Sequence, residues 1–375
     1  MKNNTLGFIF SENPEVNLSE LTSFRSLAAV PVGGRYRIID FVLSNMVNSG
    51  IIKVGIATAH KNQSLADHLG SGKDWDMARK ENGLFMLPPP EIGENAERVP
   101  GGIDYICRAT DYLKRSRQEY VVLSDCNTIC NIDYDEVLDF HIEKDADITV
   151  VHTKVGELTP GELEKNILFD IDENSRVKDI QVYPARQKIY NSYMHMFLLK
   201  KELLLNLAGD CAAHDRHSIS KDLLLANLNS LKIYSYEFSG YKKKIDSIQS
   251  FFEFNLDLLK KEVRDELFGD DSDAIYTKVK DTVPTHYKSD CEIENSFIAD
   301  GCEIEGKVEN SIIFRGVHVG KGAKVINSII MQNSHIMENC VVENSIFDKE
   351  VVLRKGKKII GQETYPVVIG KKTIV

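Results

Sequence analysis

Three arginines near the start of the chain could bind a phosphate group. Arg25, Arg35 and Arg37 lie within one short segment of the sequence. A guanidinium group offers paired N–H donors that match two phosphate oxygens, so a fork of such groups suits bidentate recognition of a phosphorylated metabolite. The alternative is that these cations form ion pairs that tie the first helix to the body of its domain. The residue types alone leave both interpretations open.

Other reactive side chains form no complete site in the sequence. Cys126 and Cys130 are the closest pair among seven cysteines, and they lack the second pair that a zinc site requires. The odd number of cysteines also argues against a disulfide framework. His318 and His335 could act as bases in the C-terminal repeats, although such histidines are more often surface residues. We therefore predict no metal site in this chain.

The composition is that of a globular protein without a nucleic-acid or membrane surface. The chain has 375 residues, with 46 basic against 56 acidic side chains and a net charge of −10. This balance favours neither nucleic acid nor an anionic membrane as a partner. No stretch approaches about 18 apolar residues, and the apolar run at the start is too short for a signal peptide. We expect a cytoplasmic protein.

The first 240 or so residues alternate short apolar runs with helical patterns. This alternation is typical of an α/β domain built on a mostly parallel sheet. The expected strands are Leu6–Phe10, Lys53–Ala57, Tyr120–Leu123, Ile148–His152, Ser192–Leu198 and Lys232–Glu237. The expected helices are Arg37–Ser49, Ile103–Arg115, Tyr134–Lys144, Lys201–Leu207 and Ser250–Arg264.

A repeated Asn-Ser motif predicts a parallel β-helix in the last part of the chain. The motif begins at Asn295, Asn310, Asn327 and Asn344, with spacings of 15, 17 and 17 residues. A coil of three short strands needs roughly 18 residues to return to its own face, and stacked coils bury a continuous apolar ladder. A β-sandwich is the alternative, but a sandwich does not require a fixed period. We expect an α/β domain over 1–265, a linker over 266–282 and a β-helix over 283–375.

The segment 21–51 resembles the N-terminal signature of glucose-1-phosphate adenylyltransferases, the ADP-glucose pyrophosphorylases. The segment Lys61–Leu65 with His68 resembles the effector-sensitive loop of that family, and the repeats from Asn295 resemble its C-terminal left-handed β-helix. The resemblance implies a Rossmann-like nucleotidyltransferase domain followed by that β-helix. It also implies that Arg25, Arg35 and Arg37 lie near a regulatory site for phosphorylated metabolites.

The positions that carry the chemistry of this family are replaced. Its reaction joins glucose 1-phosphate to ATP and needs a phosphate loop, carboxylates for Mg²⁺ and a lysine for the sugar phosphate. The glycine-rich loop falls on 12–17, where its arginine becomes Asn17, and a further lysine becomes Leu27. The first metal-holding aspartate falls on Asn127 when counted back from Asp133 and on Cys126 when counted forward from the preceding strand, with Asp125 one position away. The second metal-holding aspartate falls on Lys244, and the sugar-phosphate lysine falls on Tyr183. Ser192 alone survives from the sugar pocket. These groups act as a unit, so their joint loss predicts a non-catalytic chain.

The resemblance therefore implies a regulatory subunit of glucose-1-phosphate adenylyltransferase. Its expected partner is a catalytic ADP-glucose pyrophosphorylase subunit in a heterotetramer; Mg²⁺ belongs to that partner, and this chain needs no cofactor. One alternative is an active nucleotidyltransferase with rebuilt ligands, using Asp125, Asp246 and Lys244. Another is a stand-alone sensor of a nucleotide or a sugar phosphate.

Overall fold

A computed structural model describes residues 4–13, 16, 18–79, 81–91, 99–182, 189–269 and 273–375. The chain divides into two compact units, and each unit is built from separate segments of the sequence. The first unit comprises Met1–Pro14, Val42–His60 and Gly70–Gly240, and the second comprises Glu15–Phe41, Lys61–Leu69 and Tyr241–Val375. Because these units are not contiguous in sequence, the limits 1–265, 266–282 and 283–375 stay a prediction.

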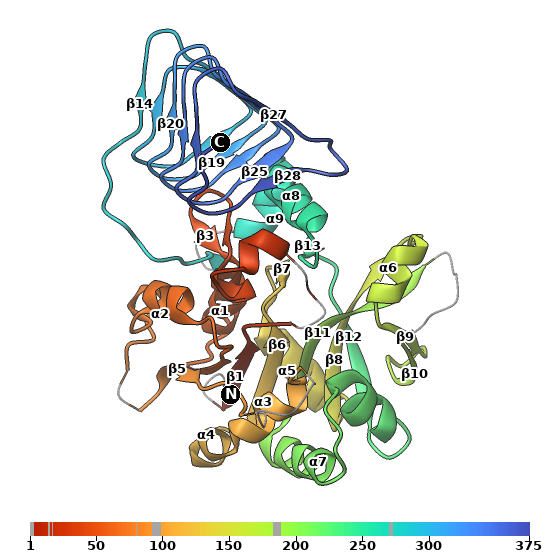
Figure 1. Ribbon diagram of the computed structural model, residues 1–375. Helices are drawn as coiled ribbons and strands as arrows, with labels where there is room; N and C mark the ends of the chain where they lie inside the picture. The colour runs from red at the N-terminus through yellow and green to blue at the C-terminus, as the bar shows by residue number, and fades with distance from the viewer. Residues whose placement is uncertain are drawn as a thin grey trace. The chain divides into compact units, whose positions relative to one another are not determined.

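Nine strands form the mixed sheet of the first unit (Figure 1). The order β10-β9-β11-β6-β1-β4-β5 is extended by β8, which pairs with β11 and β12. The strands β4, β1 and β6 are parallel neighbours, whereas β11 runs antiparallel to β6, β8 and β9. The expected α/β class is confirmed. The strands are β1 (Thr5–Phe10), β4 (Lys53–Ala57), β5 (Gly83–Leu87), β6 (Tyr120–Asp125), β8 (Ile148–Val155), β9 (Leu168–Ile171), β10 (Val177–Gln181), β11 (Tyr190–Lys200) and β12 (Ile233–Glu237).

All the expected helical regions are helical. The described α-helices are α1 (Ile38–Asn48), α2 (Gln63–Leu69), α3 (Gly102–Arg108), α4 (Thr110–Arg115), α5 (Tyr134–Glu143), α6 (Pro160–Lys165), α7 (Lys201–Ala213), α8 (Ile248–Asp257) and α9 (Lys261–Phe268). Of these, α2 and α6 were not expected, α7 is longer than expected, and two expected helices are divided. None of the described helices has both the length and the apolar character needed to cross a membrane.

Two of these differences are breaks in helices that we expected to be continuous. The helix expected over Ile103–Arg115 divides at Ala109, which has φ −88° and ψ 5°. The helix expected over Ser250–Arg264 divides into α8 and α9. There, Nη1 of Arg264 donates to the carbonyl oxygens of Leu258 and Leu259, at 3.0 and 2.7 Å. Carbonyl groups at a helix end lack hydrogen-bond donors within the helix, and the guanidinium group of Arg264 donates to two of them.

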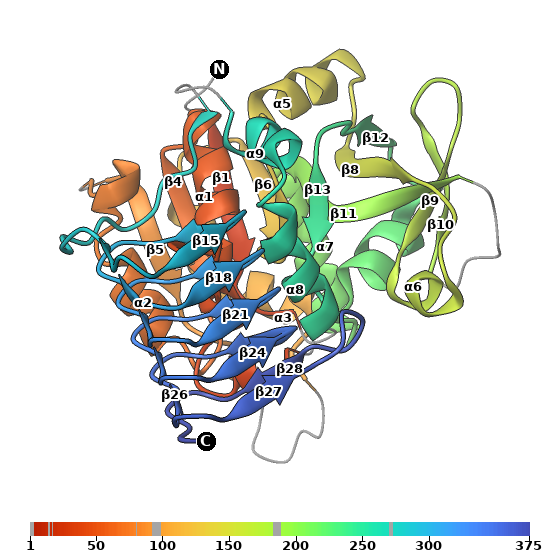
Figure 2. The same ribbon diagram turned by 90° about the horizontal axis from the view of Figure 1, so that it is seen from above.

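Three parallel five-stranded sheets form the left-handed β-helix of the second unit (Figures 1 and 2). Successive coils stack in register, so the predicted repeat architecture is confirmed. One sheet contains β14 (His286–Tyr287), β17 (Glu303–Ile304), β20 (His318–Val319), β23 (His335–Ile336) and β26 (Val352–Leu353). The next contains β15 (Glu292–Glu294), β18 (Lys307–Glu309), β21 (Lys324–Ile326), β24 (Val341–Glu343) and β27 (Lys358–Ile360). The third contains β16 (Phe297–Ile298), β19 (Ile312–Ile313), β22 (Ile329–Ile330), β25 (Ser345–Phe347) and β28 (Val367–Ile369).

The Asn-Ser motif forms one corner of each coil. The asparagines have φ values of 40°, 45°, 45° and 46°, in the left-handed region that asparagine tolerates better than most residues. The following serines form a ladder. The backbone N–H groups of Ser311, Ser328 and Ser345 each donate to the hydroxyl oxygen of the serine one coil earlier. The repeat therefore supplies both the turn and its hydrogen bonds.

The two ends of the β-helix differ. At the C-terminal end, the tail of the chain pairs with β26. The N–H of Val352 donates to the carbonyl oxygen of Thr373 at 3.0 Å, and the N–H of Val375 donates back to Val352 at 2.9 Å. At the first coil, Ile293 of β15 is 40% exposed, although its neighbour Val308 in β18 is fully buried. The apolar ladder is thus open at its first coil.

Candidate functional site

A hairpin in the second unit positions Arg35 and Arg37. Its strands are β2 (Pro31–Val32) and β3 (Tyr36–Arg37), which pair antiparallel. Gly33 and Gly34 connect them with φ values of +57° and +81°, which glycine adopts readily. The N–H of Gly33 also donates to Oδ1 of Asn255 in α8, at 2.9 Å. The Gly-Gly pair and this hydrogen bond hold the hairpin against its own unit.

Arg25 forms a buried ion pair with Asp348 of the β-helix. Nη2 of the arginine donates to Oδ1 and Oδ2 of the aspartate, at 3.0 and 2.9 Å. The side chains are only 3% and 0% exposed. Nη1 of Arg25 is buried and has no hydrogen-bond partner in the described part of the chain. One donor of the guanidinium group therefore lacks a partner within the described part of the chain.

Arg37 lies between two neighbouring segments of the same unit. Its Nη1 donates to the carbonyl oxygen and, at 2.9 Å, to the hydroxyl oxygen of Ser64, which belongs to α2. Its backbone N–H donates to Oδ2 of Asp40 at 2.9 Å. The pKa of Arg37 is lowered to about 10, mainly by burial and also by the charge of Arg25, while Asp40 opposes the shift. The effector-sensitive loop predicted from the sequence thus contacts one of the predicted arginines.

Two lysines that the sequence analysis missed lie in the same region. Burial lowers the pKa of Lys349 to about 7, assisted by Arg37, Arg25 and Lys280, while Asp348 opposes the shift. The pKa of Lys280 is also lowered, first by burial and then by the charges of Arg315, Arg37 and Lys278. Neither lysine has an ion-pair partner among the described residues. No local pattern marks them, because one is in a coil turn and the other precedes the β-helix.

The four side chains Arg25, Arg37, Lys280 and Lys349 form what we call the cation cluster. The effects on the pKa values mean that these groups are close enough to repel one another. The buried carboxylates of Asp348, beside Arg25 and Lys349, and of Asp40, beside Arg37, neutralise part of the charge. An anion with several oxygens would relieve the rest through charge-assisted hydrogen bonds. The cluster is chemically suited to a phosphate or a sulfate group.

Arg35 belongs to a different environment. Its side chain is exposed, and its guanidinium carbon is 5.8 Å from the ring centroid of Tyr36. Its charge lowers the pKa of Arg315, after the larger effect of burial. The structure therefore brings Arg25 and Arg37 together and places Arg35 beside Arg315.

A second polar cluster lies in the first unit, at the end of β6. The carboxylate of Asp125 accepts a hydrogen bond from Nδ2 of Asn13 at 3.0 Å and is 3.6 Å from Nδ1 of His195. His195 has a φ of +56° at an irregularity of β11, and its ring stacks on Tyr193 with centroids 4.8 Å apart. Asp125 pairs in register with Phe10 at the carboxyl edge of parallel strands, which is where α/β sheets commonly bind ligands.

Comparison with known proteins identifies the family. Residues 17–261 match the family described as nucleotidyl transferase, and residues 280–365 match the one described as GlmU-like, C-terminal hexapeptide. The chain belongs to the nucleotidyl transferase family. The two matched regions correspond to the α/β part of the sequence and to the β-helix.

Similar nucleotidyl transferase relatives carry two names. The glycogen biosynthesis protein GlgD of Bacillus subtilis (strain 168) is 36% identical over 369 residues, which cover 98% of this chain and 96% of the relative. GlgD of Geobacillus stearothermophilus is 40% identical over 325 residues, covering 87% and 84% of the two chains. The glucose-1-phosphate adenylyltransferase of Clostridium perfringens (strain SM101 / Type A) is 33% identical over 328 residues, covering 86% and 83%. The recognition made from the N-terminal signature is confirmed.

Some of the positions at which we predicted replaced or surviving catalytic residues lie in the first unit. Asn127 is 1% exposed in the turn between β6 and β7 (Thr128–Cys130). Ser192 is also 1% exposed, and its hydroxyl donates to Oδ1 of Asn166 at 3.1 Å. Asn17 and Tyr183 lie outside the described residues. The hydroxyl of Ser192, which we predicted to survive from a sugar pocket, is thus bonded to a neighbour within the protein.

The remaining positions belong to the second unit. Leu27 is 1% exposed in a 3₁₀ helix (Leu27–Ala29), where an apolar side chain fits and a lysine does not. Lys244 ends β13 (Lys242–Lys244) and is half-buried. Asp246 accepts a hydrogen bond from the hydroxyl of Ser250 at 3.1 Å. Within the described ranges, no three His, Cys, Asp or Glu side chains gather closely enough to hold a metal ion.

Proposed function

We propose that this chain acts in glycogen biosynthesis as a regulatory, non-catalytic subunit of glucose-1-phosphate adenylyltransferase. It binds a phosphorylated metabolite at the cation cluster and modulates a catalytic subunit that makes ADP-glucose from ATP and glucose 1-phosphate. The assembly is a heterotetramer, and Mg²⁺ acts in the catalytic partner. The similarity to GlgD proteins over nearly the whole chain supports the role in glycogen biosynthesis.

The observation that carries the regulatory proposal is the composition of the cation cluster. Arg25 and Arg37 come from the N-terminal segment of the unit and Lys349 comes from the β-helix. The buried carboxylates of Asp348 and Asp40 lie among them. An anion that bridges these groups would join the N-terminal hairpin region to the β-helix. Ligand that binds only the folded form stabilises it, by about 2.7 kcal/mol at a concentration of 100 Kd. Binding therefore has a direct effect on the conformation of this unit.

Regulation of a partner requires that the ligand favour one state of the assembly over another. A bound anion changes the relative energies of the two states only if the cluster differs between them. Coupling free energies of this kind are typically about 1–3 kcal/mol, which corresponds to roughly 5- to 150-fold in affinity. We expect an effect of this size on the response of the catalytic subunit.

The replaced positions support the non-catalytic part of the proposal. A buried leucine at position 27 cannot supply a charge to a triphosphate, and a lysine at position 244 repels Mg²⁺. Asn127 carries no charge, so it is a poor substitute for a carboxylate ligand. Because phosphate binding and metal binding act together in phosphoryl transfer, either loss alone is serious.

The decisive experiment combines purified chains. This chain, a catalytic glucose-1-phosphate adenylyltransferase subunit and their mixture are each assayed for ADP-glucose synthesis with Mg²⁺, while light scattering measures the mass of the complex. We expect no synthesis by this chain alone, a mixed species of defined mass, and altered turnover or effector response in the mixture. Synthesis by this chain at an ordinary enzyme rate, on the order of 10 per second, would overturn the non-catalytic assignment. Absence of a mixed species would favour a stand-alone sensor of a nucleotide or a sugar phosphate.

One observation favours an active transferase as the second candidate. Asp125 stands at the carboxyl edge of β6, with Asn13 and His195 beside it. A carboxylate at this edge could hold Mg²⁺ if further ligands came from a substrate. The substitution Asp125→Asn decides between the readings, because it would abolish any synthesis that depends on this site and would leave the anion response of a regulatory subunit intact.

A further inference from the structure

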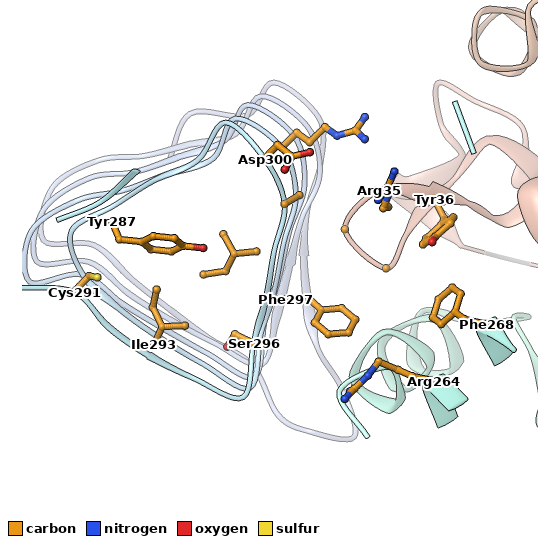
Figure 3. A pocket seen from close by; sticks show the side chains of 15 residues that line it. Arg35, Tyr36, Arg264, Phe268, Tyr287, Cys291, Ile293, Ser296, Phe297 and Asp300 are labelled. Atoms are coloured by element: carbon orange, nitrogen blue, oxygen red, sulfur yellow. The ribbon is translucent and has the colours of Figure 1, made fainter. Parts of the chain in front are cut away.

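A pocket of about 780 Å³ lies at the open first coil of the β-helix (Figure 3). Its walls come from the first coil, Arg315 of the second coil, the β2–β3 hairpin and α9, all within the second unit. The volume falls in the range of small-molecule sites, which is about 300–1,000 Å³. The pocket lies beside Arg35 and does not include the side chains of the cation cluster.

One side of the pocket is aromatic. The rings of Tyr36 and Phe268 stack with their centroids 5.4 Å apart and an interplanar angle of 29°. Phe297 lies across from Phe268, and Figure 3 shows both rings bordering the same space. Tyr287 and Ile293 continue the apolar surface into the open coil, where they are 50% and 40% exposed. Flat apolar surfaces of this kind favour contact with a planar ring.

The other side of the pocket is cationic. Arg35 and Arg315 are close enough for one charge to lower the pKa of the other, and Asp300 opposes that effect. Neither arginine forms an ion pair among the described residues. Nε of Arg315 is buried and has no hydrogen-bond partner in that part of the chain. An unpaired buried donor beside a like charge is energetically costly, and an anion removes both costs.

Arg264 adds a third cation that is already fixed in place. Its guanidinium carbon is 5.4 Å from the ring centroid of Phe297, while its Nη1 caps the end of α8. Among the described lining residues there are thus three guanidinium groups against one carboxylate, that of Asp300. The field inside the pocket favours a negatively charged ligand.

We propose that this pocket binds a small organic anion with a planar aromatic body. Arg35 and Arg315 hold the carboxylate, phosphate or sulfonate group, and the ring lies against Phe297 and Phe268. The pocket lining shares no residue with the cation cluster, although Arg315 is close enough to Lys280 of the cluster to lower its pKa, and the proposal does not rest on the regulatory role. It accounts for two features that the cluster leaves unexplained, the position of Arg35 and the unpaired Nε of Arg315.

The test uses two fluorescent probes with related rings. One is 8-anilinonaphthalene-1-sulfonate, an aromatic sulfonate, and the other is N-phenyl-1-naphthylamine, which lacks the sulfonate. We expect Arg315→Gln to raise the Kd of the sulfonate about ten-fold, as expected for one charge-assisted contact, and to leave the Kd of the neutral amine within about two-fold. Phe297→Ser should weaken both probes. Lys355→Gln removes an exposed cation that does not line the pocket, and it should change the Kd of neither probe.

Three results would overturn the proposal. The first is an equal Kd of the sulfonate for the wild type, Arg35→Gln and Arg315→Gln. The second is a loss of sulfonate binding in Arg37→Ala, which would assign the anion to the cation cluster. If the sulfonate does not bind and Arg315→Gln instead weakens the complex with a catalytic subunit, the pocket is a protein-docking face and the proposal is wrong. Arg35→Gln and Arg315→Gln remove no hydrogen bond or ion pair seen among the described residues, so these variants should fold.

Discussion

Arg25 and Asp348 are 323 positions apart in the sequence, yet Nη2 of the arginine lies 2.9 Å from Oδ2 of the aspartate. Neither side chain is more than 3% exposed. The pair joins the segment before the hairpin to a coil of the β-helix within one unit. Breaking a buried ion pair from one side is costly, because the remaining charge has no compensation.

The substitution Asp348→Asn should therefore destabilise the protein. Loss of one partner of a buried pair costs about 3–5 kcal/mol, and denaturant unfolding of the second unit measures it. Glu350→Gln is the matched control, because Glu350 is 43% exposed and its ion pairs with Lys371 and Lys372 are loose. We expect that control to change the free energy of unfolding by no more than about 1 kcal/mol. Equal stability of Asp348→Asn and the wild type would contradict the role of this pair.

Anion binding at the cation cluster should depend on pH through Lys349. The pKa of this lysine in the folded chain is about 7, below its ordinary value of 10.5, because of burial and the neighbouring arginines. The charged form that attracts an anion is therefore lost as the pH rises through about 7. Between pH 6 and pH 8, the affinity for sulfate should fall by about ten-fold, since protonated lysine becomes the minor species. Isothermal titration with sulfate is suitable, because sulfate itself does not titrate in this range.

The control for the pH dependence is Lys349→Gln. That variant should bind sulfate weakly, with an affinity that hardly changes over the same pH range. In the wild type, the unfolded chain keeps Lys349 charged between pH 7 and about 10.5 while the folded chain does not, so the free energy of unfolding has a component that rises with pH. Lys349→Gln should lack this component. If the affinity of Lys349→Gln for sulfate still changed with pH, another titrating group, such as His68, would be responsible.

Arg37→Ala and Arg35→Ala should separate the two anion sites. Arg37→Ala removes a member of the cation cluster, and we expect it to weaken the response of the mixed complex to a phosphate effector by ten-fold or more, since a charge-assisted contact is worth roughly 1.5–3 kcal/mol. Arg35→Ala should leave that response within about two-fold. Kinetics of ADP-glucose synthesis across effector concentrations measure both. Equal effects of the two substitutions would argue against a cluster that excludes Arg35.

The serine ladder of the β-helix should contribute to its stability. Ser328 is fully buried; its hydroxyl donates to the carbonyl oxygen of Ile326 at 2.7 Å and accepts from the N–H of Ser345 at 3.2 Å. Ser328→Ala should lower the free energy of unfolding by about 1–3 kcal/mol, because the N–H group is left buried without its acceptor. Ser289→Ala, at an exposed serine, should change it by less than about 0.5 kcal/mol. If Ser328→Ala left the free energy of unfolding unchanged, the serine hydrogen bonds would not stabilise the β-helix.

The β-helix was predictable because its signal is local and repeated. Each Asn-Ser pair sets its own turn and bonds its own neighbours, so a period in the sequence corresponds directly to a period in space. The division between α8 and α9 was not predictable in the same way. It depends on Arg264, whose side chain reaches back to two carbonyl groups, and the apolar pattern is continuous across that break.

The candidate site shows the same contrast. Arg25 and Arg37 were found because they stand in a distinctive segment, but Lys349 and Lys280 have no pattern around them. Their role depends on a low effective dielectric and on the sum of neighbouring charges, which exists only after the coils have stacked. The position of Arg35 was also hidden, because the hairpin turn decides which neighbours each arginine meets.

Asp348 and Lys349 stand near the C-terminal end of a stack in which each coil is supported only by its neighbours. In such a one-dimensional array, the end coils open most easily, with free energies well below that of global unfolding. Fraying of the last coil would therefore dismantle the anion site before the rest of the β-helix is disturbed. Hydrogen exchange of Val352, whose N–H is bonded to Thr373 of the tail, would report the occupancy of the site from a distance.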